Sequence, residues 1–99
     1  MIVAFSIAGT PDASGSYADS VAEVVRIVRG SGLPHETNAM FTNIEGEWDE
    51  VMAVVKQCVD AMAAHSPRVS LVVKADIRPG HDGMLESKVR SVEDRLAGG

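Results

Sequence analysis

The sequence predicts an α+β fold in which two helices cover one face of a four-stranded antiparallel sheet. Two patterns predict it: short apolar runs rich in β-branched residues, typical of strands, and longer stretches with apolar residues three or four apart, typical of helices. Along the chain these patterns follow the order β-α-β-β-α-β-α. The first six form the split βαβ, or ferredoxin-like, sandwich, and the seventh is an extra C-terminal helix.

Size and composition favour a single domain over residues 1–99. Hydrophobic residues make up 45% and charged residues 23%, as in ordinary globular proteins. No run approaches the ~18 apolar residues of a membrane span, and the N-terminus lacks the basic region of a signal peptide. One cysteine, Cys58, rules out an intrachain disulfide, so a cytoplasmic protein is expected. A net charge of −5 argues against non-specific nucleic-acid binding.

The first strand and helix are indicated by residues 2–8 and 16–30. The strand is apolar on both faces, and alternation places Ser6 on the face opposite Val3 and Phe5. The loop between the two elements lacks the spacing of a phosphate-binding glycine loop. Ser16 is the expected N-cap of the helix, whose valines recur at helical spacing.

The middle of the chain predicts two strands and a second helix. Strands at about 35–39 and 41–46 form either a tight hairpin or one long bent strand. The helix, at about 47–64, has an acidic first turn, which its dipole favours. Cys58 lies on the apolar stripe of this helix and is interpreted as a small buried hydrophobe, because a catalytic thiol needs an electropositive, partly exposed site.

The last strand and helix complete the pattern. Residues 68–78 alternate as a strand, residues 79–83 form a turn, and a short helix from Leu85 ends at the final glycines. Two helices cover one face of the sheet and leave the other bare. A half-apolar open face predicts self-association through sheet faces or edges. The open face carries Ser6, Ser70, Val72, Lys74 and Asp76.

Residues 35–49 carry the most varied chemistry, including the only tryptophan. Polar groups mixed with large flat or soft side chains are typical of a small-molecule pocket, and equally of a polar hairpin with core anchors. Glu45 ends a strand and points toward whatever cavity lies beside the second helix. The three histidines lie in separate segments without partners at ligand spacing, so no metal site is expected. Lys74 and Arg78 can either bind an anion or form ion pairs across strands or between subunits.

Four segments resemble a known family: residues 31–40, the run from Thr42 through Ile44-Glu45-Gly46-Glu47-Trp48-Asp49, residues 66–70 and residues 74–78. Together they resemble the small thiamine-binding, ferredoxin-like family, over nearly the whole chain. The resemblance implies dimers, and usually tetramers, formed through the sheets. It implies binding of thiamine (vitamin B1) or its hydroxymethylpyrimidine moiety without catalysis. The residues that match the family pattern near the ligand are Ser6, Ser16, Asn38, Thr42 and Glu45, with Trp48 beside them.

The chemistry of these residues suits an aminopyrimidine. Asn38 can meet the ring edge with a donor and an acceptor, and Glu45 can accept from the amino group. Trp48, Phe41 or Met40 can stack on the ring, and an aromatic face suits the cationic thiazolium. Two positions depart from the family: Ala8-Gly9 stands where proline is frequent, and Ser20 where tyrosine is frequent.

The resulting hypothesis is a non-catalytic carrier or sensor with a small-molecule ligand, no catalytic residue, no cofactor and no metal. Two alternatives remain open. One is an oligomeric enzyme on the same fold, such as an acylphosphatase-like hydrolase or a cofactor-free oxygenase. The hydrolase would need an arginine-bearing loop after the first strand, which residues 9–12 do not supply. The other is a structural or regulatory homo-oligomer without a small ligand.

Overall fold

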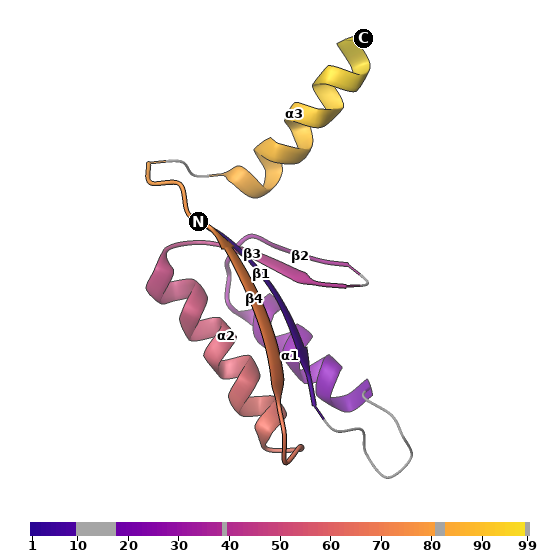
Figure 1. Cartoon of the computed structure of the whole chain (residues 1–99), viewed down its shortest axis with the longest axis vertical. Helices are drawn as coiled ribbons and strands as arrows, with labels where there is room; N and C mark the ends of the chain where they lie inside the picture. The colour runs from indigo at the N-terminus through magenta and orange to yellow at the C-terminus, as the bar shows by residue number, and fades with distance from the viewer. Residues whose placement is uncertain (10–17, 39, 81–82, 99) are drawn as a thin grey trace.

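The computed structural model describes residues 1–9, 18–38, 40–80 and 83–98, and this part of the chain confirms the predicted α+β fold (Figure 1). The described residues form a four-stranded sheet in the order β2-β3-β1-β4, with every neighbouring pair antiparallel. This is the ferredoxin-like order. The elements are β1 (Ile2–Ala8), α1 (Ala18–Gly30), β2 (His35–Thr37), β3 (Thr42–Glu45), α2 (Trp48–Ala63), β4 (Ser70–Asp76) and α3 (Met84–Gly98).

The hydrophobic core lies between the sheet and the helices α1 and α2, which pack against each other. Alternation along β1 works as predicted, since Val3 and Phe5 are buried beside Ile44 of β3. A hydrogen bond at 3.0 Å between His65 Nε2 and Glu23 Oε2 joins α1 to the segment that follows α2 at the surface. The stripe of α2 supplies the largest share of the core, through Val51, Val54, Val55, Cys58 and Met62.

The bounds of β1 are as predicted, and the other element boundaries differ from the predicted ones by at most two residues. Helix α1 begins at Ala18, and the expected N-cap, Ser16, lies outside the described residues. Residues 35–46 form a hairpin rather than one bent strand, and β2 ends at Thr37 because Asn38 starts the turn. Helix α2 begins one residue later than predicted. The Glu47 N–H donates to Glu50 Oε1 at 3.1 Å, which satisfies a backbone donor at the helix start.

The face of the sheet opposite α1 and α2 is called the open face here. Register places Ala4 and Ser6 of β1 beside Lys74 and Val72 of β4 on this face. Val72 is 56% exposed although it lies in the middle of a strand. Its neighbours Leu71 and Val73, which face the helix side, are also exposed, because β4 is an edge strand that the helices do not fully cover.

The predicted extra helix is present as α3, which extends away from the sheet (Figure 1). It makes the molecule 52 Å long against 29 and 21 Å in the other directions. Its main contact is with β3, and Leu96 near its end is 78% exposed. Among the described helices, including α3, none has the length and apolar character needed to cross a membrane.

Candidate functional site

A cavity of about 230 Å³ opens between the β2-β3 hairpin, the second half of β1 and the start of α1, and is called the hairpin cavity here. It exists because β3 is shorter than β1. The last β1–β3 pair is Phe5 with Thr42, whereas β1 continues along β4 as far as the pair of Ala8 with Ser70. The lining residues are Phe5, Ser6, Ile7, Val21, Val24, Val25, Thr37, Asn38, Met40, Phe41 and Thr42.

Asn38 holds the turn of the hairpin. Its Oδ1 accepts from the backbone N–H groups of Met40 and Phe41, each at 2.9 Å, and its own N–H donates to the Phe41 carbonyl at 3.0 Å. Both lone-pair positions of Oδ1 are therefore used by the turn. Toward a ligand Asn38 offers its amide NH₂ as a donor, and the two-sided contact expected from the sequence is not available in this conformation.

Hydroxyl groups supply the remaining polar lining. Thr37 and Thr42 pair across the two strands, with their Oγ1 atoms 3.5 Å apart. Each hydroxyl can donate or accept, so together they can meet an amino group. Ser6 lies at the rim, because register turns its side chain toward the open face.

The apolar walls of the hairpin cavity come from the hairpin tip and from α1. Val21 is 49% exposed although it begins the valine stripe of its helix. The three buried or half-buried valines further along the chain pack normally, so the exposure of Val21 marks the unfilled space in front of it. Phe41 offers a flat face at the other side. This combination of apolar walls with a few convergent polar groups is typical of a binding pocket for a small organic molecule.

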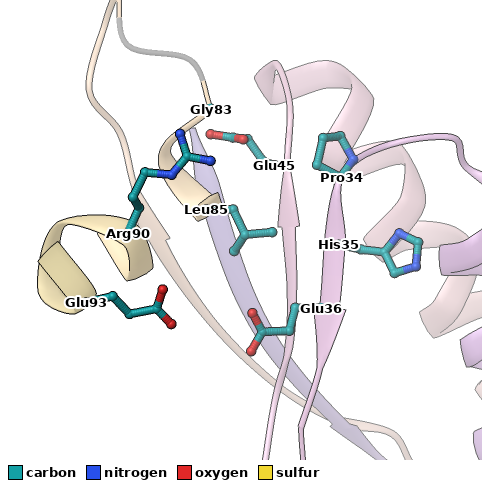
Figure 2. Close-up of a pocket in the computed structure, with 8 residues that line it drawn as sticks. All are labelled: Pro34, His35, Glu36, Glu45, Gly83, Leu85, Arg90 and Glu93. Atoms are coloured by element: carbon teal, nitrogen blue, oxygen red, sulfur yellow. The ribbon is translucent and has the colours of Figure 1, made fainter. Parts of the chain in front are cut away.

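Glu45 lies elsewhere, in a larger cavity of about 580 Å³ between β3 and the start of α3, called the α3 cavity here (Figure 2). Glu45 is only 7% exposed, and Arg90 extends from α3 toward it. Leu85 points into the space between helix and strand, whereas His35 points away. The cavity is lined by Pro34, His35, Glu36, Glu45, Gly83, Leu85, Arg90 and Glu93.

Trp48 lies in a third cavity, of about 210 Å³, at the start of α2. Its indole is exposed, and Met1, Ile77 and Arg78 line the same space. A ring bound between Thr37 and Thr42 is therefore not stacked on Trp48 in one protomer. Phe41 and Met40 are the large side chains that can contact it there.

The six residues expected at one site thus fall in different places. Ser6, Asn38 and Thr42 line one cavity, Glu45 and Trp48 each line another, and Ser16 lies outside the described residues. Sequence reasoning did not assign Val21 or Thr37 to the site. Their signals were present: Val21 opens a helix that follows a polar loop, and Thr37 precedes a turn-forming asparagine.

Other reactive groups are limited in the part of the chain that the structure describes. No cluster of three histidine, cysteine or acidic side chains with metal-binding geometry occurs there. Cys58 is fully buried, and burial raises the pKa of its thiol from 9.0 to about 11. A neutral, inaccessible thiol is a poor nucleophile. His81 and Asp82, interpreted from sequence as a solvated turn, lie outside the described residues.

The comparisons with known proteins agree on one family. The model of the family described as "Thiamine-binding protein" matches residues 3–93. A UPF0045 protein of Mycobacterium bovis is 52% identical over 98 residues, which cover 97% of this chain and 94% of that protein.

Solved structures show the same fold. A Methanocaldococcus jannaschii protein gives a TM-score of 0.81 at 25% identity, covering 93% of this chain and 94% of that one. A Thermotoga maritima protein, proposed to act in thiamine biosynthesis or salvage, gives a TM-score of 0.70 at 21% identity. The alignment covers 92% of this chain and 99% of the Thermotoga chain.

Proposed function

The chain belongs to the thiamine-binding protein family, and we propose that it binds the aminopyrimidine ring of thiamine, or free hydroxymethylpyrimidine, in the hairpin cavity. The observation that carries this proposal is that Asn38 and Thr42 line one cavity with an aromatic wall, with Ser6 at its rim. The three were expected near a ligand from the family pattern alone. The meeting of Asn38 and Thr42 in one cavity is independent support.

The donors and acceptors match the ring in a specific way. The Asn38 NH₂ donates to a ring nitrogen, because its Oδ1 is held by the turn. The hydroxyls of Thr37 and Thr42 accept from the exocyclic amino group, and Phe41 contacts the ring face. A ligand that lacks the amino group would leave a partly buried hydroxyl without a partner, at a cost of about 1–3 kcal/mol.

The size of the hairpin cavity favours one ring over two. Cavities that enclose drug-sized ligands are usually ~300–1,000 Å³, and this cavity is about 230 Å³. It suits the pyrimidine and leaves the thiazolium of thiamine at the mouth. The net charge of −5 favours a ligand that carries this cation.

We place the protein among non-catalytic carriers or sensors. The described lining of the hairpin cavity consists of apolar side chains, hydroxyls and one amide, without a group that titrates near neutral pH. General acid–base catalysis needs such a group. An enzyme on the same fold remains the alternative, and it would have to use the α3 cavity, where carboxylates and an arginine gather.

Self-association into a dimer or tetramer through the sheet, in the cytoplasm, completes the proposal. The edge strand β4 exposes apolar side chains on both faces, and such edges pair with other strands unless they are covered. A 99-residue domain also buries only a small core, so pairing adds stability.

Isothermal titration calorimetry tests the ligand and the cavity together. Hydroxymethylpyrimidine, thiamine and thiamine phosphates are titrated at mildly alkaline pH into wild type, Asn38→Asp, Thr42→Val and Glu45→Gln. Asn38→Asp keeps an oxygen for the turn but removes the NH₂ donor, so we expect the Kd to rise by about tenfold or more. Thr42→Val should raise it by about fivefold or more. Glu45→Gln should change it by less than about twofold, well below 1 kcal/mol, because Glu45 lines the α3 cavity and not the hairpin cavity.

Asn43→Asp is the matched control, because it makes the same substitution in β3 outside the hairpin cavity. It should leave binding unchanged. No heat from any ligand at high concentration would reject the function. Binding that survives Asn38→Asp and Thr42→Val but is lost in Glu45→Gln would move the ligand to the α3 cavity.

A further inference from the structure

The basic residues of this chain are unevenly distributed, and the hairpin cavity is built from segments that have none. None of the nine lysines and arginines occurs in residues 1–25 or 30–55. These two stretches supply every described residue that lines the hairpin cavity. The one histidine in them, His35, is outside that lining, and its Nδ1 lies 2.9 Å from the Leu33 carbonyl oxygen. The described lining therefore carries no cationic side chain.

The basic residues nearest to the lining lie past it. Arg26 follows Val21 by five residues, which is about 140° around the helix at 3.6 residues per turn. Arg29 follows Val21 by eight residues, about 12 Å further along the axis of α1. Arg68 lines a separate cavity, of about 220 Å³, beyond the end of β1. None of the three is among the residues that line the hairpin cavity.

Acidic residues, in contrast, adjoin the lining on two elements. On α1, Asp19 and Glu23 flank Val21 at two residues to either side, and in β2 Glu36 precedes Thr37. The chain around the hairpin cavity therefore carries negative charge without a compensating lysine or arginine.

The start of α1 does not replace the missing cations. Anions bind at helix N-termini because free N–H groups and the helix dipole face them. Here the first turn, which begins at Ala18, contains Asp19, and a carboxylate at this position offsets the dipole. Residues 9–16, which precede the helix, contain neither a lysine nor the glycine spacing of a phosphate-binding loop.

A phosphate ester of the proposed ligand would need the groups that this site lacks. A phosphate monoester carries a charge of about −1.5 to −2 at pH 7, and proteins hold it with arginine, lysine or a helix N-terminus. The hairpin cavity has room for one ring, so the phosphate would lie at its mouth beside the acidic residues. The free hydroxymethyl group needs only a hydrogen-bond partner, and the Ser6 hydroxyl at the rim can be one.

We infer that the hairpin cavity selects unphosphorylated hydroxymethylpyrimidine and rejects its phosphate ester by charge. This rests on the function proposed above and adds the class of ligand: the neutral alcohol, against the phosphate anion. The form that binds is the one that precedes phosphoryl transfer to the hydroxyl group.

Isothermal titration calorimetry with the alcohol and its phosphate ester, each at about 0.05 M and about 0.5 M NaCl, tests the selection. At low salt the Kd of the ester should exceed that of the alcohol at least about fivefold. At high salt the ratio of the two Kd values should fall toward one, because salt screens the repulsion. A ratio of one or less at low salt would overturn the inference. A high ratio that does not change with salt would show that shape excludes the ester, and would overturn it as well. No heat from either ligand would reject the proposed function itself.

A cation placed in the lining gives a second measurement. Val21 is half-exposed on α1, so Val21→Arg adds a positive charge at the wall of the cavity without emptying the core. We expect the ratio of the two Kd values at low salt to fall at least about fivefold. Val21→Gln changes the same wall without a charge, so the ratio should stay as in wild type even where both Kd values rise.

Gln57→Arg is the matched control for net charge, because it adds the same charge on α2, outside the lining of the hairpin cavity. Its ratio should remain close to that of wild type. An unchanged ratio in Val21→Arg would contradict the inference. An equal fall in Gln57→Arg would attribute the rejection to the net charge of the molecule and would also overturn it.

Discussion

The buried thiol of Cys58 makes the stability of the fold depend on pH. Its burial in α2 raises the thiol pKa from 9.0 to about 11, because the core disfavours the thiolate. In the unfolded chain the thiol ionises at the lower pH, so the unfolded state holds fewer protons between these two values. Stability from this group is therefore complete below pH 9 and is lost as pH rises toward 11.

The expected result is a fall in the free energy of unfolding of about 2–3 kcal/mol between these pH values, at 1.36 kcal/mol per pKa unit. Urea denaturation of wild type and Cys58→Ala measures it. The alanine variant is less stable throughout, but lacks this group's titration, so the difference between the two proteins should shrink at high pH. A constant difference would show that the thiol pKa is ordinary.

Asn38 and Glu45 show how far single positions could be predicted. Both were expected at one ligand site from the family pattern. However, Thr42 and Glu45 are three apart in β3, and alternation along a strand already places them on opposite faces. The turn role of Asn38 was also open to local reasoning, since asparagine often accepts from backbone groups two and three residues on. The α3 cavity was not predictable, because it depends on a contact between elements far apart in sequence.

At the scale of the element, the Asn38 side chain of the β2-β3 hairpin both stabilises the turn and, in the proposed site, contacts the ligand. Asn38→Ala removes the acceptor of two backbone bonds, whereas Asn38→Asp keeps an oxygen for both. We expect the alanine variant to lose about 1–2 kcal/mol of stability and the aspartate variant to lose less than half of that. Thermal unfolding measures both, and equal losses would show that the turn does not depend on the Oδ1 bonds.

Among the elements, the succession of strands and helices along the chain followed from periodicity, and the antiparallel sheet followed from the ferredoxin-like pattern of that succession. Boundaries near turns did not, because a side chain such as that of Asn38 ends a strand earlier than its apolar pattern suggests. The exposure of β4 could not be predicted from the sequence either. Its alternation resembles that of a buried strand, and only the sheet order shows that it lies at an edge.

At the scale of the molecule, apolar side chains of the described residues remain exposed on the open face around Val72 and at the end of α3 around Leu96. The small core of a 99-residue chain makes their burial between copies energetically useful. The hairpin cavity lies on the helix side of the sheet, so pairing through the open face leaves it accessible. Ligand binding and assembly thus use opposite faces of one sheet.

Backbone amide NMR during titration with hydroxymethylpyrimidine locates the ligand and so tests whether it binds in the hairpin cavity. If the ligand binds in the hairpin cavity, the largest shifts should occur at its polar and aromatic lining: Ser6, Thr37, Asn38, Phe41 and Thr42. The shifts at Leu85 and Arg90, which line the α3 cavity, should be small. Shifts concentrated at Glu45, Leu85 and Arg90, with the hairpin unchanged, would contradict binding in the hairpin cavity.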